Sequence, residues 1–331
     1  MKGQFGFGVS NCRPAVEVVR AVQEAEALGA GIAFIAEDIN CRDAFELAAL
    51  SVMGTDRIRL ATGVVNPFTR NPTSLAMAVA TLDEISQGRA VLGLGSSSPS
   101  LIEDQMGIPA AGTVGVMRES VEIIRALLGG EDVTYRGRHF TYTEASLSVR
   151  PVQERVPVYF AAMGPRMLRL AGQIADGVLL NVGASTEYVR WAVDEVRKGS
   201  REAGRHREDV TIAAWITAYV SVDREASLRR AREWLAMMLS IPRQGELLLE
   251  HSGMQVDASV LSGIRAHFGA YPHRGDRAAA AAYIPEELPE RLAIIGDVDQ
   301  ARVRLDEYRA AGVDVPVLSL SALKALQLQQ I

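Results

Sequence analysis

Three short apolar runs of this chain end in small residues, and a ligand could approach the backbone at each of these ends. The runs are Ala61–Pro67, Val91–Ser98 and Val158–Gly164, and each contains glycine. Glycine lacks a Cβ atom, so the N–H groups around it can come close to an anionic or planar ligand. We therefore expect a binding site that is lined by backbone and divided among several loops.

Acidic side chains are scarce at the predicted strand ends, where Glu37 and Asp38 are the two that directly follow a strand. They could donate or accept a proton, or hydrogen-bond a heterocyclic ring. A structural alternative for Asp38 is that it caps the next helix or pairs with Arg42, because aspartate is a favoured helix cap.

Gly164 directly precedes a predicted helix that starts with Pro165 and Arg166. The free N–H groups and the dipole of such a helix could hold a phosphate. The alternative is that this sequence is only a good helix start.

Familiar catalytic sets are missing from the predicted strand ends. No histidine follows a strand, and neither a Ser–His–Asp set nor convergent metal ligands occur there, so we predict no metal. A site with few acids and bases but much accessible backbone fits redox chemistry, in which a bound cofactor carries the difficult step.

The composition narrows the class of protein. The 331 residues carry a net charge of −5 and are 48% hydrophobic, which argues against nucleic acid as a partner. No apolar run reaches the roughly 18–20 residues of a membrane-spanning helix, and no signal-peptide pattern opens the chain, so we expect a cytoplasmic protein. Cys12 and Cys41 lie far apart in the sequence, and we expect two partly buried free thiols rather than a disulfide.

Strand-like and helix-like runs alternate along most of the chain. The predicted strands cover residues 4–10, 31–36, 58–64, 90–94, 156–161, 177–181, 210–220 and 313–318. The predicted helices cover residues 15–28, 44–53, 72–85, 114–128, 166–174, 186–203, 225–239 and 298–311. These eight repeats predict a (β/α)8 TIM barrel, as a single domain over residues 1–331. The alternative is a doubly wound open sheet, which is disfavoured because no G-x-G-x-x-G follows the first strand.

Two stretches depart from the repeat. Residues 131–149 are polar and aromatic around a turn at Gly137, which predicts a β-hairpin inserted before the fifth strand. Residues 240–290, between the seventh strand and the last βα unit, are rich in proline and glycine, and we expect an irregular, partly helical insertion. Long insertions of a barrel usually cover the active face or form an oligomer contact.

The motifs at these strand ends resemble those of the luciferase-like flavin- or deazaflavin-dependent oxidoreductases. The resemblance is greatest to methylene-tetrahydromethanopterin reductase-like members, which use coenzyme F420. It covers most of the chain and is carried by the segments 36–38, 62–67, 70–72, 80–89, 92–96, 157–159, 161–165, 171–172 and 175–177.

This resemblance implies a TIM barrel with the deazaflavin or flavin ring at its carboxyl-terminal mouth. It implies a non-proline cis peptide between Gly63 and Val64, which forms a bulge behind the ring. It places Glu37 and Asp38 near the ring as the candidate catalytic pair. The implied cofactor-binding residues are Gly63, Val64, Val65, Asn66, Gly95, Ser96, Ser97, Ala162, Met163, Gly164 and Asn181.

The chain also departs from its relatives at two positions. Gly8 stands where the resemblance places a glutamate that serves as the proton donor of the reductase, which argues against reduction of methylene-tetrahydromethanopterin. Ser98 replaces an acid of the sugar-phosphate dehydrogenating relatives, so that reaction is not implied either.

We therefore predict a homodimeric oxidoreductase that transfers a hydride between coenzyme F420 and a small organic substrate. The prediction includes no nucleic-acid partner and no membrane association. An FMN-dependent luciferase-like monooxygenase is the first alternative. A non-catalytic flavin-binding barrel is the second.

Overall fold

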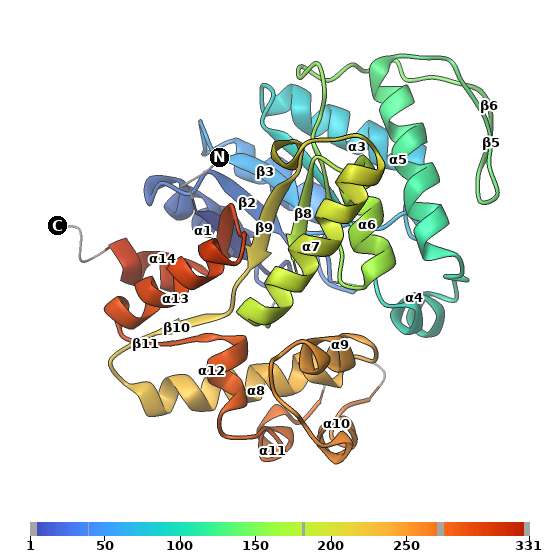
Figure 1. Ribbon diagram of the computed structural model, residues 1–331. Helices are drawn as coiled ribbons and strands as arrows, with labels where there is room; N and C mark the ends of the chain where they lie inside the picture. The colour runs from blue at the N-terminus through green and yellow to red at the C-terminus, as the bar shows by residue number, and fades with distance from the viewer. Residues whose placement is uncertain (1–4, 39, 181–182, 270–274, 328–331) are drawn as a thin grey trace.

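In the computed structural model, eight parallel strands close into a barrel, which confirms the predicted fold class (Figure 1). The structure describes residues 5–38, 40–180, 183–269 and 275–327. Around the barrel the order is β1-β12-β9-β8-β7-β4-β3-β2. These strands are β1 Gly6–Val9, β2 Ile32–Ile35, β3 Arg59–Thr62, β4 Ala90–Leu94, β7 Val158–Ala161, β8 Gly177–Leu180, β9 Thr211–Trp215 and β12 Val315–Leu318.

Alternate residues of each strand face the inside of the barrel or the helices around it. In β1, Phe7 and Val9 belong to the large core under the helices, whereas an added Cβ at Gly6 would meet Val317, Val315 and Ile32 of the inner core. The inner core consists of Ile32, Phe34, Ala61, Val91, Tyr159, Leu179, Ala213, Val315 and Val317. The barrel is therefore filled by side chains, and a ligand can approach only at its ends.

The helices that cover the barrel begin and end close to the predicted positions. They are α1 Ala15–Ala27, α2 Ala44–Val52, α3 Pro72–Ile85, α5 Thr113–Gly129, α6 Pro165–Ile174, α7 Thr186–Glu202 and α13 Val298–Ala310. Helix α3 has the predicted bounds because Pro72 fits the first helical position and Asn71 accepts a hydrogen bond from the N–H of Ser74 at 2.9 Å. Outside the insertion at residues 240–290, two α-helices of the described part of the chain were not predicted, α4 Pro99–Met106 and α14 Leu320–Gln327.

The predicted strand over residues 210–220 is wrong in its length. It divides into β9 and a second strand, β10 Ala218–Val220, which leaves the barrel and pairs in parallel with β11 Ile294–Gly296. Continuous apolar sequence conceals this division, because both halves are strands and differ only in their partner.

The segment 131–149 forms the expected hairpin, with strands β5 Val133–Arg136 and β6 Thr141–Ala145. Figure 1 shows it beside α5, on the flank of the barrel. Glu119 of α5 is buried and accepts hydrogen bonds from the backbone N–H groups of Arg138, His139 and Phe140, at 2.9 to 3.0 Å. This carboxylate attaches the hairpin to the helix layer.

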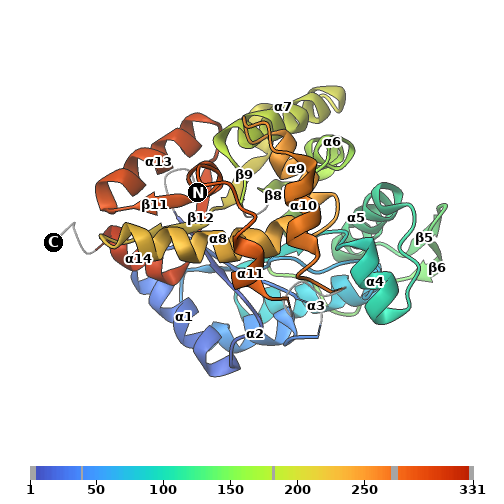
Figure 2. The same ribbon diagram turned by 90° about the horizontal axis from the view of Figure 1, so that it is seen from below.

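The second insertion is a helical layer with its own apolar core. It contains α8 Arg224–Ser240, α9 Gln244–Glu250, α10 Ala258–Arg265, α11 Arg277–Ala281 and α12 Leu288–Leu292. Figures 1 and 2 show this layer lying across one end of the barrel. Met163, in the loop after β7, packs against its core, so the layer lies at the carboxyl-terminal end of the strands.

Within the described part of the chain, no helix combines the length and apolar character needed to cross a membrane.

Candidate active site at the barrel mouth

The barrel order brings most of the predicted site residues together. Strands β7, β4, β3 and β2 are consecutive neighbours, and the candidate residues follow their carboxyl ends. The ends of these four strands form a continuous arc, which we call the ligand arc. Its partly exposed or exposed members are Glu37, Asp38, Gly63, Val64, Ser96, Ser97, Met163 and Gly164.

The middle of the ligand arc is backbone packed on backbone. An added Cβ at Gly93 would run into the carbonyl of Thr62, and one at Gly95 would lie 2.5 Å from Val64 Cγ2. The Thr62 hydroxyl donates to the carbonyl of Gly93 at 2.8 Å and accepts from its N–H at 2.9 Å. Because only glycine fits at these two positions, the ends of β3 and β4 present peptide groups rather than side chains.

The peptide bond between Gly63 and Val64 is cis, as the resemblance implied. Both residues are partly exposed at the mouth. The next two residues turn away: the Val65 side chain is fully buried in the core under the helices. Asn66 is also buried, and its Oδ1 accepts from the N–H groups of Phe68 and Thr69 at 3.1 and 2.9 Å.

The end of β4 becomes progressively more open. Gly95 is buried, Ser96 is partly exposed and Ser97 is exposed with a φ of 55°. These two hydroxyl-bearing residues lie between the glycine-lined wall and the start of α4.

The end of β7 leads into α6 through Ala162, Met163 and Gly164. Gly164 is the residue before the helix, and an added Cβ there would meet no described atom within 4 Å. The Met163 carbonyl accepts a hydrogen bond from the Tyr188 hydroxyl at 3.0 Å. Burial raises the pKa of Tyr188, so it remains a neutral donor. The predicted residue Asn181 lies outside the described residues.

Glu37 is held by two partners. Its Oε1 is 3.2 Å from Arg70 Nε, and its Oε2 accepts from the N–H of Ala44 at 3.0 Å. Arg70 also forms an ion pair with Asp43. Burial disfavours the Arg70 charge, but the hydrogen bond that Arg70 donates to Asp43 and the charge of Glu37 outweigh it and raise the pKa of Arg70.

Asp38 is positioned by residues that follow β1. Its backbone N–H donates to Asn11 Oδ1 at 3.0 Å, and its Oδ2 accepts from the Ser10 hydroxyl at 3.5 Å. The alternative that Asp38 caps the next helix is wrong. Asp43 is the N-cap of α2, where it accepts from the N–H of Phe45 at 2.8 Å.

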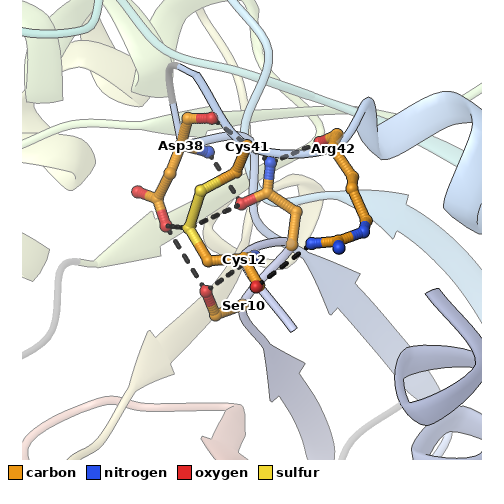
Figure 3. The surroundings of a disulfide bond; sticks show 6 residues. Ser10, Cys12, Asp38, Cys41 and Arg42 are labelled. Atoms are coloured by element: carbon orange, nitrogen blue, oxygen red, sulfur yellow. Dashed lines mark hydrogen bonds between the residues drawn. A yellow bond between two sulfur atoms is a disulfide. The ribbon is translucent and has the colours of Figure 1, made fainter. Parts of the chain in front are cut away.

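The expectation of two free thiols is also wrong, because Cys12 and Cys41 form a disulfide. The loops after β1 and β2 are adjacent in the barrel and bring the Cα atoms to 4.9 Å, although the residues are 29 apart in sequence. Figure 3 shows the disulfide beside Asp38 and Ser10, with Cys12 Sγ 3.7 Å from Asp38 Oδ2. Arg42 donates to the Cys12 carbonyl at 3.1 Å. Sequence distance could not reveal this pairing, because strand adjacency creates it.

Trp215, which was not predicted, also reaches the mouth. It is the last residue of β9, is partly exposed and packs against the inner core. A large aromatic residue at the carboxyl end of a strand was the available signal in the sequence. No cluster of three or more His, Cys, Asp or Glu side chains able to hold a metal occurs among the described residues.

The comparisons with known proteins agree with this geometry. The chain is 30% identical over 310 residues to the 5,10-methylenetetrahydromethanopterin reductase of Methanolobus tindarius, covering 93% of this chain and 91% of the relative. It is 32% identical over 292 residues to the enzyme of the same name from Archaeoglobus fulgidus, covering 88% and 86%.

Solved structures show the same fold. The coenzyme F420 dependent tetrahydromethanopterin reductase from Methanopyrus kandleri matches with a TM-score of 0.88 at 27% identity, over 99% of this chain and 97% of that one. A family model described as luciferase-like monooxygenase matches residues 4–315. This chain therefore belongs to the luciferase-like monooxygenase family.

Proposed function

We propose that this protein is an oxidoreductase that transfers a hydride between coenzyme F420 and a small organic substrate. The observation that carries the proposal is the glycine-lined ligand arc, which offers backbone to a planar ring at the ends of β3 and β4. The similarity to the solved coenzyme F420 dependent reductase supports F420 rather than FMN as the cofactor.

The residues of the ligand arc fit such a cofactor. Gly63, Val64 and Gly95 would lie against the ring, since any larger residue at Gly95 would collide with Val64. Ser96 and Ser97 would bind the cofactor's side chain. The N-terminus of α6 after Gly164 has free space for a phosphate, and its unpaired N–H groups favour an anion.

Val65, Asn66 and Ala162 would act through the backbone in this proposal. Val65 and Ala162 are buried, and the side-chain oxygen of Asn66 is engaged in its own turn. Their contribution would be to hold the cis peptide and the start of α6 in place. Asn181 stays a prediction from the resemblance.

When bound, the reduced deazaflavin supplies a hydride, and the substrate then requires one proton. We propose Asp38 as the proton relay, which takes up a proton and passes it to the substrate; its carboxyl group lies at the mouth beside the Ser10 hydroxyl. Glu37 instead positions the loop, because both of its oxygens are engaged by Arg70 and by the N–H of Ala44. The pair predicted from the sequence thus has two different roles.

Calorimetric titration with F420 and with FMN tests the cofactor assignment. We expect saturable binding of F420 and binding of FMN that is weaker by at least tenfold. Tight FMN binding without an F420 signal would favour the monooxygenase, and binding of either cofactor without turnover of any acceptor would favour a non-catalytic barrel.

Gly63→Val tests the ligand arc in the same titration. The added Cβ would lie 3.0 Å from Phe34 Cβ, so the side chain would disturb the wall that meets the ring. We expect the affinity for F420 to fall by at least tenfold while the protein still melts cooperatively. Gly269→Val is the matched control, because an added Cβ there meets no described atom within 4 Å.

We further propose that the protein acts as a cytoplasmic homodimer on a small-molecule substrate, without nucleic acid or a membrane. The dimer is supported by exposed apolar side chains on two adjacent helices, α2 and α3, and in the residue that ends α2. These are Leu50, Met53, Met77 and Ile85. Exposed apolar side chains on neighbouring helices commonly mark an interface.

A further inference from the structure

Among the described residues, Trp215 is one of two partly exposed apolar residues that pack against the inner core of the barrel. The other is Val64, in the cis peptide of the ligand arc. The remaining members of the inner core are buried. A ligand that enters the mouth and reaches the barrel floor therefore meets Val64 or the indole of Trp215.

The indole is seated on Gly8 of β1. An added Cβ at Gly8 would come closer than 3 Å to three indole atoms, with Nε1 at 2.8 Å. Trp215 pairs with Val317 of β12, and β12 lies between β9 and β1. The ring thus extends from β9 past β12 to β1, and the indole occupies the space that a side chain at position 8 would need.

The closed strand order places Trp215 across the barrel from β3, one of the two middle strands of the ligand arc. Strand β9 is four strands from β3 in either direction around the barrel. A ring bound on the β3–β4 wall would leave the side of the mouth that Trp215 and Gly8 form for the substrate. This step rests on the function proposed above.

We propose that Trp215 determines substrate specificity by stacking its indole against a planar, conjugated part of the substrate. Aromatic faces favour offset stacking on other π systems, beyond the apolar area that they bury. In the corresponding reaction, the reduced cofactor loses two electrons as a hydride to one atom of the conjugated bond, and a proton adds to the other. The substrate class is therefore a conjugated carbonyl or quinone-like ring.

The experiment uses the full-length protein and two bicyclic probes, planar 1,4-naphthoquinone and saturated 1-decalone. Calorimetry measures the affinity for each probe and, separately, for F420. The variants are Trp215→Leu, Trp215→Phe, Gly8→Ala and the double variant Gly8→Ala/Trp215→Phe. Trp191→Phe is the control, since Trp191 stacks on His251 in another part of the molecule.

We expect the wild type to prefer naphthoquinone, and Trp215→Leu to bind it about tenfold more weakly, the upper part of the range measured for aromatic pairs. Trp215→Phe should lose less, because a ring remains. Gly8→Ala should weaken naphthoquinone binding, because the added methyl group displaces the indole. The double variant Gly8→Ala/Trp215→Phe should recover part of this affinity, because the smaller phenyl ring leaves room for the methyl group. Trp191→Phe should bind both probes like the wild type.

Equal naphthoquinone affinity in the wild type and Trp215→Leu would overturn the proposal. The proposal would also be overturned if Trp215→Leu lost affinity for F420 alone, because Trp215 would then bind the cofactor and not the substrate. If Trp215→Leu does not fold, the Gly8→Ala variants test the proposal instead. A loss of naphthoquinone affinity in Gly8→Ala that persists in Gly8→Ala/Trp215→Phe would count against stacking. Probe binding is measured without cofactor, so a failure to bind F420 refutes the proposed function without affecting this result.

Discussion

At the scale of the residue, two neighbouring acids have different surroundings. Glu37 forms an ion pair with Arg70 and accepts from the helix N–H of Ala44. Asp38 accepts from Ser10 and lies beside the Cys12–Cys41 disulfide at the mouth. Asp38 is the acid that we propose as the proton relay, because it lies at the mouth beside the Ser10 hydroxyl.

We predict that Asp38→Asn lowers turnover by roughly 10²–10⁴-fold, the usual contribution of general acid–base catalysis. Glu37→Gln should chiefly lower the melting temperature, because it removes a charged partner of Arg70. The measurements are steady-state oxidation of reduced F420 with an accepted substrate and thermal melting of each variant. Full turnover in Asp38→Asn would leave the proton to water or to the substrate itself.

At the scale of the element, single contacts tie loops and insertions to the barrel. The disulfide joins the loops after β1 and β2, and Glu119 joins the β5–β6 hairpin to α5. Both contacts join segments that are distant in the sequence.

We predict that Cys12→Ser/Cys41→Ser lowers the free energy of unfolding by about 3–4 kcal/mol, from the chain entropy of a closed loop of this length. Urea unfolding of the variant and of the oxidised wild type measures the difference. Wild type treated with dithiothreitol should match the variant. Identical unfolding of all three samples would show that the two thiols do not pair in solution.

The hairpin contact should depend on pH. Burial alone would raise the pKa of Glu119, but hydrogen bonds from the backbone of His139, Arg138 and Phe140 lower it below its usual 4.5. A lowered folded-state pKa gives stability that is present above pH 4.5 and lost as the pH falls through the folded-state value.

We therefore predict that Glu119→Gln destabilises the protein by about 2 kcal/mol at pH 7, the scale of a hydrogen bond to a charged group, and by less at acidic pH. Chemical unfolding at both pH values measures this, and hydrogen exchange should show faster exchange in the hairpin. Exposed Glu131→Gln is the control. If the difference in free energy of unfolding between Glu119→Gln and the wild type stayed constant down to pH 3, the charge of the Glu119 carboxylate would not be the cause of the destabilisation.

At the scale of the whole molecule, we distinguish three surfaces. They are the barrel, the helical layer across its mouth, and the side of α2 and α3 that carries exposed apolar side chains. The mouth serves the proposed chemistry, and the α2–α3 side is available for assembly. Met53 is 88% exposed and Met77 is 51% exposed, which is costly for a monomer in water.

We predict that Met53→Glu/Met77→Glu shifts the proposed dimer to a monomer in light scattering after gel filtration, because it places charges in the proposed apolar interface. Val222→Glu is the control, since Val222 is 94% exposed and lies before α8, away from these helices. A dimer that persists in the double variant would place the interface elsewhere.

The sequence by itself determined the barrel and the ligand arc. Strand and helix periods are local properties, so α3 and β4 have their predicted bounds. Glycines at the ends of β3, β4 and β7 were visible as motifs, and at Gly93 the close approach of two backbones requires glycine.

Only the tertiary structure decided how these residues are paired. These pairings are the Cys12–Cys41 disulfide, the pairing of β10 with β11 instead of a barrel strand, and the seating of Trp215 on Gly8. Each joins segments that are separate in sequence. Closing the barrel makes β1 the neighbour of both β2 and β12. Long-range neighbours of this kind are fixed by packing, and local sequence carries no signal of them.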